Sequence, residues 1–567
     1  MNSVAAALSW ADRRSEQLAL AILGVLMAVT AVVLYREGHG LILFFDEWSI
    51  VMDRRDWDLD TFMKPHNEHI ALLPIAVLKL LFVTVGLDDY WVYRVVAITV
   101  HLICVTLLFL LLRRRLGDWL ALIGAAFILF LGSAWEDLLW PFQIGFVGSI
   151  AAGLGVLLAL ESRSRAADLV AAILLAISLA CSSIGLPFFV AALVDVGLRP
   201  GWRARLWVPL APFALWVLWY LAYGKDGVLQ GTTLGTAALV KSNLSLAPAF
   251  AADLIASGFG ALVGLGLEWG RPLAVAAFVV AFIRLGRDAM LPPGLATVLS
   301  LGVAYWGLTA AFRAHLNAAE TASKYTYLSA VVVVLIAAEL LRGMRVTRQA
   351  LVLLSLIMVV AAFANFAKLQ EGLVTLRDSS SHVAAELAAV EIAAEHVDPA
   401  FRPDSGRAPP VEAGPYLEAV EDLGSPADTP NEVLRRPEPV RQAADFVLVK
   451  ALRIGPYRAR PPTADSAPQV IAAEGAIERT GPCVLFRPSG APSSVELRAD
   501  ADLVVSNEGP LGAEYRLRVF ADGYPATASG QLEPQSTQTI PLGRGELPRP
   551  WWLRVTTHGP VELCTAA

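Results

Sequence analysis

The sequence predicts a polytopic α-helical membrane protein with a mainly-β domain at its C-terminal end. Of its 567 residues, 56% are hydrophobic and 17% are charged, whereas a soluble domain carries about 25% charged residues. Apolar runs of helical length recur from about residue 18 to about residue 366, and they are absent beyond about residue 377. The net charge of -6, with mostly short basic clusters, argues against a nucleic-acid-binding surface.

Arginine clusters orient the apolar runs, because short cytoplasmic loops retain positive charge. Placing every cluster on the cytoplasmic side predicts about 11 transmembrane helices, a cytoplasmic N-terminus and an extracytoplasmic C-terminal half. The clusters are Arg113 to Arg115, Arg163 with Arg165, Arg199 with Arg203 and Arg205, Arg284 with Arg287, and Arg342 with Arg345 and Arg348. The predicted spans are about 18–35, 91–112, 118–133, 143–160, 167–184, 186–198, 206–223, 271–285, 294–312, 326–341 and 349–366.

Two further apolar stretches are not counted as spans. Residues 70–85 contain Pro74 and Lys79, and a crossing there would place the triple arginine outside. We expect an interfacial helix. Residues 247–267 are rich in Gly and Ala and contain Asp253, and a crossing there would invert every later cluster. We expect a re-entrant or interfacial segment.

The predicted domains are a transmembrane domain over 1–370, a helical and Pro-rich connection over 371–460, and a β-sandwich-like domain over 461–567. A helix is expected over about 380–396. Apolar and polar residues alternate over 495–503, around Tyr515 and around Trp552, which is typical of half-buried strands. Since this half is predicted outside, Cys483 and Cys564 are expected to form a disulfide that ties the first strand to the last.

The first outer link, about 36–90, is the richest in polar groups. Asp46 and Glu47 follow the first span closely, near a depth where an ionised carboxylate is costly unless it serves a site. Adjacent carboxylates can share a proton or bind a divalent cation, so either could activate a hydroxyl nucleophile. The alternative is that the pair only solvates a loop.

His66 and His69 would share one helix face, with Glu68 beside them. The spacing matches no strong zinc signature, so hydrogen bonding to a sugar or phosphate is favoured over metal binding. The competing interpretation is a cap for the interfacial helix, because Asn67 suits a helix start.

Other polar groups are predicted at the outer ends of later spans. Glu136, Asp137 and Gln143 lie between the third and fourth spans and could form a second wall of an acceptor or sugar site, or an interfacial anchor with the nearby tryptophans. Cations near headgroup level could bind a phosphate, although basic residues often snorkel at that depth. These residues are Arg313, His315 and Lys324, with Tyr325 beside the last.

The Asp-Glu pair after the first helix, the interfacial helix and the late Lys-Tyr element resemble the GT-C superfamily of polyprenyl-phosphate-sugar-dependent glycosyltransferases over about residues 18–366. The Phe-Asp-Glu-Trp and Pro-His-Asn-Glu-His strings also resemble a poorly characterised bacterial membrane-protein group, often actinobacterial. The resemblance implies Asp46 as catalytic base with Glu47 in support. It also implies Lys324 and Tyr325 at the lipid phosphate. The C-terminal domain matches no module of the superfamily.

The expected function is an inverting glycosyltransferase in the bacterial cell membrane. It would move a sugar from a polyprenyl phosphate to a cell-envelope glycan or lipid at the outer face. No cofactor is assigned, and a divalent cation is left open. The alternatives are a lipid or polysaccharide transporter or flippase, which predicts charged residues inside mid-bundle helices, and a non-catalytic envelope scaffold, which predicts that the first-loop acids are dispensable.

Overall fold

A computed structural model describes residues 14–227, 232–286, 291–316, 323–344, 346–458, 467–490, 492–545 and 547–566. The chain divides into two compact units. The first comprises the described residues up to His39, then Arg54–Val85 and Asp89–Thr375. The second comprises Gly40–Asp53, Gly86–Asp88 and the residues from Leu376 onward. Two short segments of the first polar link therefore group with the C-terminal half of the chain.

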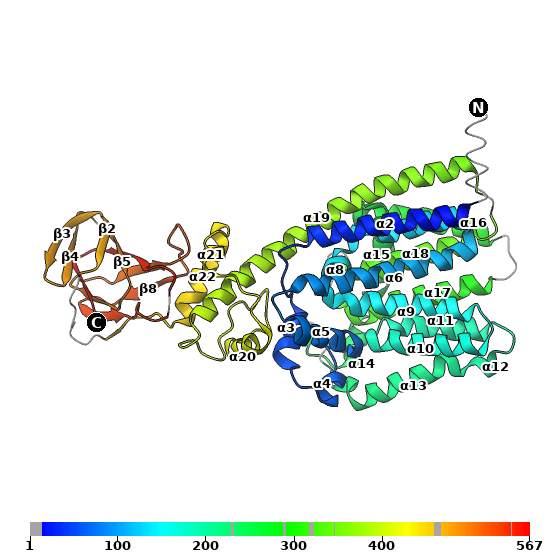
Figure 1. Cartoon of the computed structure of the whole chain (residues 1–567), viewed down its shortest axis with the longest axis horizontal. Coiled ribbons are helices and arrows are strands. Elements are labelled where there is room, and N and C mark those ends of the chain that lie inside the picture. The colour runs from blue at the N-terminus through cyan, green and yellow to red at the C-terminus, as the bar shows by residue number, and fades with distance from the viewer. Residues whose placement is uncertain are drawn as a thin grey trace. The chain divides into compact units, whose positions relative to one another are not determined.

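The first unit is a bundle of helices (Figure 1). Its main helices are α2 (Ser15–Glu37), α5 (Leu72–Val85), α6 (Tyr90–Leu116), α7 (Asp118–Leu129), α9 (Ile144–Leu160), α10 (Arg165–Cys181), α11 (Gly185–Gly197), α13 (Trp207–Ala222), α14 (Thr236–Asn243), α15 (Ala247–Val263), α16 (Gly266–Leu285), α17 (Pro293–Arg313), α18 (Lys324–Leu341) and the beginning of α19 (Arg348–Ile392). Its short helices are α4 (Leu59–Met63), η1 (Gly132–Ala134), α8 (Trp135–Leu139), η2 (Pro141–Gln143), α12 (Trp202–Arg205), η3 (Gly224–Asp226) and η4 (Ala314–Leu316).

Nine helical segments among the described residues are long and apolar enough to cross a membrane. Two of the eleven predicted spans are shorter helices: α10 has 17 residues and α11 has 13. The eighth predicted span is longer than expected, because α16 begins at Gly266 and continues through Pro272. A proline is tolerated inside such a helix where neighbouring groups satisfy the freed backbone carbonyl.

Glycines let the central helices approach closely. Helix α9 packs against α6, α10 and α11, and a Cβ at Gly153 would lie 2.3 Å from the ring of Phe188. Ser149 and Ser178 each donate a 2.8 Å hydrogen bond to the backbone carbonyl of the other, which joins α9 to α10. Small residues and interhelical hydrogen bonds of this kind replace the hydrophobic effect as the source of helix association in lipid.

The stretch 247–267, excluded as a span from the arginine pattern, forms α15 and the turn into α16. Helices α14 and α15 are bent by 78° relative to each other, which is the geometry of a broken span or a re-entrant loop. Gly264 ends α15 with φ of +70°, and a Cβ at Gly260 would lie 2.0 Å from the carbonyl oxygen of Gly266. The two glycines allow α15 and α16 to form a tight hairpin.

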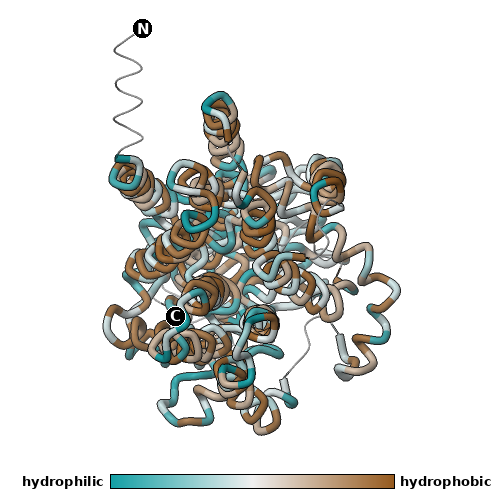
Figure 2. The backbone as a smooth tube through the Cα atoms, turned by 90° about the vertical axis from the view of Figure 1, so that its right-hand side faces the viewer, coloured by the Kyte–Doolittle hydropathy of each residue, from teal (hydrophilic) through white to brown (hydrophobic). Residues whose placement is uncertain are grey.

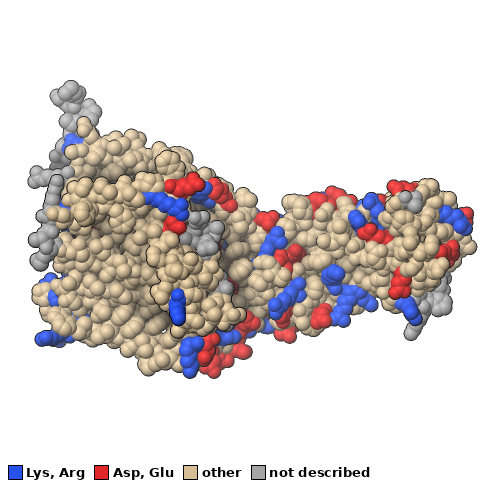
Figure 3. Space-filling model, turned by 180° about the vertical axis from the view of Figure 1, so that it is seen from behind, with Lys and Arg blue, Asp and Glu red and all other residues tan. Residues whose placement is uncertain are grey.

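The surface of the bundle is apolar. Phe282 is 79% exposed, Phe363 74% and Val280 67%, and apolar residues run along most of the helices (Figure 2). On the face seen in Figure 3, charged side chains are sparse over the middle of the helical unit. An apolar surface of this extent requires lipid rather than water as its solvent, so the chain is a membrane-spanning helical protein.

Several arginines of the predicted cytoplasmic clusters are held in ion pairs at helix ends. Arg115 at the end of α6 pairs with Glu161 after α9 at 2.9 Å and with Glu339 near the end of α18 at 2.5 Å. Arg205 pairs with Asp168 at 2.5 Å. These pairs draw the ends of separate helices together at one end of the bundle. Arg287 and Arg345 lie outside the described residues.

The helices of the second unit are α3 (Asp46–Asp53), the C-terminal part of α19, α20 (Ala413–Leu423), α21 (Pro430–Val433) and α22 (Glu438–Ala451). The helix expected over about 380–396 is present as far as Ile392, but it is continuous with the last span, because α19 runs unbroken over 45 residues. The polar segment after the apolar run consists largely of good helix formers, so it ends the lipid-facing surface without ending the helix. Trp48 of α3 packs edge-on against Tyr416 of α20, with ring centroids 6.2 Å apart.

The β part of the second unit contains two antiparallel sheets. One has the order β1-β9-β6-β11-β4-β3 and the other β2-β5-β10-β7-β8. The strands are β1 (Tyr457–Arg458), β2 (Gln469–Ala473), β3 (Gly475–Thr480), β4 (Cys483–Pro488), β5 (Ser493–Ala499), β6 (Leu503–Asn507), β7 (Ala513–Arg518), β8 (Ser529–Leu532), β9 (Ser536–Ile540), β10 (Trp551–Thr557) and β11 (Val561–Thr565). Alternate residues of β5, β7 and β10 are buried, as the alternating pattern predicts.

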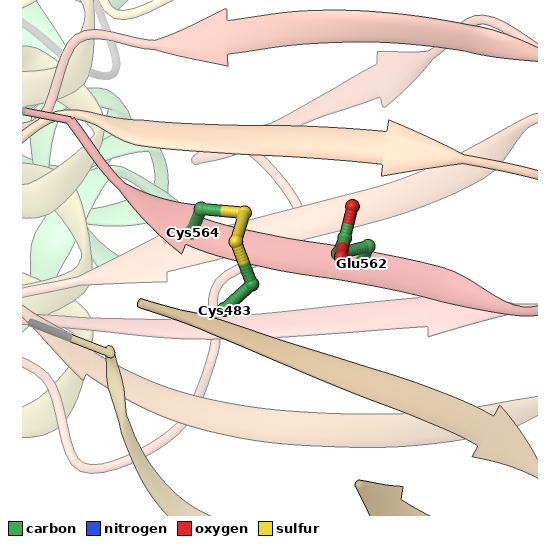
Figure 4. Close-up of side chains that lie close together, drawn as sticks. All are labelled: Cys483, Glu562 and Cys564. Carbon is green, nitrogen blue, oxygen red and sulfur yellow. A yellow bond between two sulfur atoms is a disulfide. The ribbon is translucent and has the colours of Figure 1, made fainter. Parts of the chain in front are cut away.

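The structure corrects two details of the predicted β domain. The alternation over 495–503 is divided between β5 and β6, which lie in different sheets, because the chain turns at residues 500–502. Cys483 and Cys564 are joined in a disulfide (Figure 4). It connects β4 to β11, so the first cysteine is not in the first strand. The short strands β1 to β3 precede it.

Candidate functional site

The first unit contains a cavity of about 160 Å³ with charged and apolar walls. Its charged and phenolic side chains come from the turn before α5, from α13, from η3, from α17 and from α18. They are Glu68, His69, Tyr220, Lys225, Tyr305, Arg313 and Tyr325. Four of these seven are among the predicted site residues, and Tyr220, Lys225 and Tyr305 are not. The cavity therefore collects groups that are far apart in the sequence.

Arg313, the last residue of α17, is the centre of the charged wall. Its side chain is 7% exposed, and its guanidinium forms an ion pair with the carboxylate of Glu68. The Nη2 atom lies 3.2 Å from Nε2 of His69, and Nε donates a 3.1 Å hydrogen bond to the hydroxyl of Tyr325. A buried cation held by three side chains in this way has a fixed position and direction, which suits a site for an anion.

The segment that carries His66 and His69 is not helical, so the predicted shared helix face is wrong. The two residues exchange backbone hydrogen bonds of 2.9 and 3.0 Å across a tight turn, and Asn67 in that turn has φ of +52°. Asparagine tolerates this left-handed conformation better than most residues. The turn places Glu68 and His69 on the cavity, whereas the buried ring of His66 contacts Phe142 at a centroid distance of 4.8 Å.

Tyr325 is held from two sides at the start of α18. Its hydroxyl accepts from Arg313, and its backbone carbonyl accepts a 2.6 Å hydrogen bond from the hydroxyl of Tyr305. The ammonium of Lys324 lies 5.7 Å from the Tyr325 ring centroid, but Lys324 is not among the residues that line the cavity. Of the predicted Lys-Tyr pair, only the tyrosine reaches it.

Glu136 has a structural role that its sequence position does not reveal. Its carboxylate accepts from the hydroxyl of Ser323 at 2.8 Å and from the backbone N–H of Lys324 at 3.0 Å. These contacts cap the first turn of α18 and satisfy a donor that the helix leaves free. The predicted wall of acceptor-binding residues is therefore partly a support for the helix that carries Tyr325.

Asp137 and Gln143 follow Glu136 and are deeply buried, each 2% exposed. Neither lines the charged cavity. Both carboxylate oxygens of Asp137 and the side-chain oxygen of Gln143 lack a hydrogen-bond partner within the described part of the chain. Burying oxygens of this kind without a partner costs free energy in lipid. No hydrogen bond within the described residues offsets that cost in the α8–η2 segment.

A second cavity, about 460 Å³, has almost entirely apolar walls. Helices α4, α10 and α13 and the beginning of α5 contribute to it, and Trp216 of α13 lines both cavities. Trp216 stacks on Tyr220 with centroids 5.5 Å apart, and Tyr220 lines the charged cavity. The sequence analysis missed this wall, although the aromatic residues at 213, 216 and 220, spaced to share one helix face, are a signal that could have predicted it.

Asp46 and Glu47, the predicted catalytic pair, belong to the second unit. Asp46 is half-buried at the beginning of α3, whereas Glu47 is 1% exposed. The carboxylate of Glu47 accepts a 2.8 Å hydrogen bond from the backbone N–H of Phe44. Glu47 therefore fixes the turn into α3, and Asp46 is the more accessible of the two carboxylates.

The remaining predicted groups have other partners. His315 lies 3.4 Å from the amide of Asn243 on α14 and does not line the charged cavity. Cys483, Glu562 and Cys564 gather within 4.8 Å of one another as a metal site would require, but the two sulfurs are bonded to each other (Figure 4). A disulfide offers no thiolate ligand, so this group is a covalent link.

Comparison with known proteins provides no family assignment: no protein-family model matches the chain, and no curated protein is similar to it in sequence. The fold and the cavities define the class as a helical membrane protein with a C-terminal β part.

Proposed function

We propose that this protein is a membrane glycosyltransferase that takes a sugar from a polyprenyl phosphate and transfers it to a hydroxyl of a cell-envelope glycan or lipid. The observation that carries the proposal is a pair of unlike cavities that share Trp216 as a wall residue. One holds the buried Arg313, and the other is apolar. A lipid phosphate has the matching composition, an anionic head joined to a hydrocarbon chain.

The predicted topology supports transfer at the outer face. The charged cavity is lined by the end of α17, the beginnings of α11 and α18, and the residues after α13. The arginine clusters at the opposite ends of these helices predict that all four of the cavity-lining ends face outward. The same rule places the N-terminus in the cytoplasm and the C-terminal unit outside the cell membrane.

In the proposed reaction, the acceptor oxygen attacks the anomeric carbon while the bond from that carbon to the phosphate oxygen breaks. The sequence resemblance assigns removal of the proton of the acceptor hydroxyl to Asp46, and the polyprenyl phosphate leaves with the electron pair of the broken bond. Arg313 and the exposed Lys225 would stabilise the charge that the phosphate gains. A single displacement inverts the anomeric configuration.

The test must separate a phosphate ligand from a structural ion pair, because removing Arg313 alone leaves the buried Glu68 carboxylate unpaired. The paired variant Glu68→Gln/Arg313→Gln removes both charges and retains similar shapes. We expect this protein to fold in detergent and to lose sugar transfer by about 10²-fold or more.

The matched control is Asp168→Asn/Arg205→Gln, which removes a similarly buried ion pair of 2.5 Å at the opposite ends of the helices. It should transfer sugar at the wild-type rate. A Glu68→Gln/Arg313→Gln protein that folds and transfers sugar as fast as this control would refute the phosphate site.

A further inference from the structure

The outward face of the five-stranded sheet carries a cluster of cations and aromatic rings. We define this arginine–aromatic face as Arg498, Arg516, Arg518, Tyr524, Trp552 and Arg554. Trp552 on β10 lies directly opposite Arg498 on β5 and Arg518 on β7 in the strand register. The two guanidinium carbons lie 5.6 and 4.4 Å from its ring centroid. The indole thus has a guanidinium on each side.

Tyr524 extends the stack. Its ring centroid lies 4.9 Å from the guanidinium carbon of Arg518 and 4.4 Å from that of Arg554. A guanidinium that stacks on a ring keeps its N–H groups in its own plane, where they can still donate to a carboxylate or phosphate. The stack therefore orients several donors without using all of them.

The charges on this face do not balance. Arg554 pairs with Glu496 at 2.6 Å and Arg516 with Glu514 at 2.7 Å. For Arg498 and Arg518, no carboxylate partner lies within ion-pair distance among the residues that the structure describes. The nearby Asp522 is engaged by Arg441 at 2.6 Å. Two guanidiniums on the same ring thus retain uncompensated charge.

The same arginines have unused hydrogen-bonding capacity. The Nε atoms of Arg498 and Arg518 are buried without an acceptor in the described structure, although an Nη atom of Arg518 donates to the carbonyl of Ala521 at 2.8 Å. In addition, Arg554 and Arg516 are directly opposite each other across β10 and β7. Like charges in such positions destabilise a sheet, and here Glu496 and Glu514 each compensate one of the two arginines.

Polar uncharged groups surround the arginines. Ser494 lies opposite Thr556 in one row of the sheet, and Gln469 faces Arg498 in another. Trp552 is the one large apolar side chain at the outward positions of β5, β7 and β10. Hydroxyl and amide groups repeated at strand spacing suit the hydroxyls of a sugar chain, whereas a lipid surface would require apolar side chains that insert.

We propose that the arginine–aromatic face binds an anionic glycan chain, with Arg498 and Arg518 contacting its acidic groups. This binding does not depend on the proposed transfer reaction, and it can be measured without donor lipid. The probe is fluorescein-labelled oligogalacturonate, a chain of uronic acids, titrated with the full-length protein in detergent. Neutral dextran oligomers and vesicles containing anionic lipid are compared with it.

The variant Arg498→Gln/Arg518→Gln should weaken oligogalacturonate binding by at least about tenfold, and added salt should weaken wild-type binding. The matched control is Arg479→Gln/Arg487→Gln. It removes the same charge from β3 and β4 in the other sheet and should bind like the wild type. Equal melting temperatures of the two variants would show that both are folded.

Three results would overturn the proposal. The first is equal oligogalacturonate affinity of the two double variants. The second is wild-type binding to dextran that is as tight as binding to oligogalacturonate. The third is binding to anionic vesicles with no binding to the uronic-acid chain, which would assign the face to lipid headgroups.

Discussion

Asp46 is the residue on which the proposed chemistry depends. It is half-buried at the beginning of α3, next to the buried and hydrogen-bonded Glu47. Asp46→Asn preserves the shape of the side chain and removes its basicity. Because a positioned base contributes about 10² to 10⁴-fold, we expect transfer by the purified variant to fall by that factor with its melting temperature unchanged.

The control for Asp46→Asn is Asp58→Asn. Asp58 caps α4 by accepting a 2.7 Å hydrogen bond from the backbone N–H of Thr61, and asparagine caps a helix equally well. This variant should retain activity. Full activity of Asp46→Asn with donor lipid would end its assignment as the base.

Asp445 makes the stability of the second unit depend on pH. It is fully buried in α22 and accepts hydrogen bonds of 2.8, 2.8 and 2.9 Å from the backbone N–H groups of Val519, Phe520 and Ala521. Burial raises the pKa of this carboxyl from 3.8 to about 6, against the opposing effect of the three N–H donors. Since the folded pKa exceeds the unfolded pKa, ionisation destabilises the fold.

The contribution of Asp445 to stability is therefore greatest below about pH 4, falls as the pH rises through about 6, and then levels off. The total change is about 3 kcal/mol. Calorimetric unfolding at pH 4 and pH 7 should show the wild type losing stability relative to Asp445→Asn. A wild-type advantage that grows with pH would contradict this account.

At the scale of elements, the disulfide between β4 and β11 can be tested directly by peptide mapping. The bonded cysteines are separated by 81 positions in the sequence. Peptide mapping without reduction should recover a Cys483–Cys564 linked pair, and Cys104 and Cys181, which are free and buried, should appear as thiols. In a chain-entropy description, closing a loop of this length stabilises the fold by about 4 kcal/mol.

Reduction should therefore lower the melting temperature of the wild type, and it should have no effect on a Cys483→Ser/Cys564→Ser variant. Two unmodified thiols at these positions in protein taken from the cell would contradict both the pairing and the oxidising environment that it requires.

Elements were predictable from the sequence where one local pattern decides them. Apolar length predicted most spans, and alternation predicted β7 and β10. The tight turn at Asn67 was not predictable, because a His-x-x-His spacing fits a helix equally well until the +52° φ of Asn67 is known. The division of 495–503 into β5 and β6 was missed because Ala501 continues the alternation through the turn.

At the scale of the whole molecule, the candidate site was only partly predictable. Glu68 and His69 were identified from the polar first outer link, and Arg313 and Tyr325 from basic and tyrosine residues at the predicted outer ends of spans, which are properties of single segments. Their convergence on one cavity depends on how distant segments pack. Lys225 and Tyr305 were missed for that reason, and Lys324 was predicted at the site from its charge at the outer end of a span and from the resemblance of the Lys-Tyr element.

The proposed orientation of the bundle predicts which residues reagents can reach. A cysteine introduced at Lys64 and another near the C-terminus should react with a membrane-impermeant maleimide on intact cells. A cysteine at Arg114 should react only after the cells are opened. Labelling of Lys64 and the C-terminus from opposite sides would contradict the arrangement, and the outer-face reaction would then have to be abandoned.

The most direct test of the proposed function is the pool of lipid-linked sugars in cells that lack the protein, measured by mass spectrometry. A transferase that consumes a polyprenyl phosphate sugar predicts that one such species accumulates. The wild-type gene should restore the normal pool, whereas Asp46→Asn and Glu68→Gln/Arg313→Gln should not. An unchanged pool, or restoration by both variants, would contradict the transferase and favour a scaffold or a transporter.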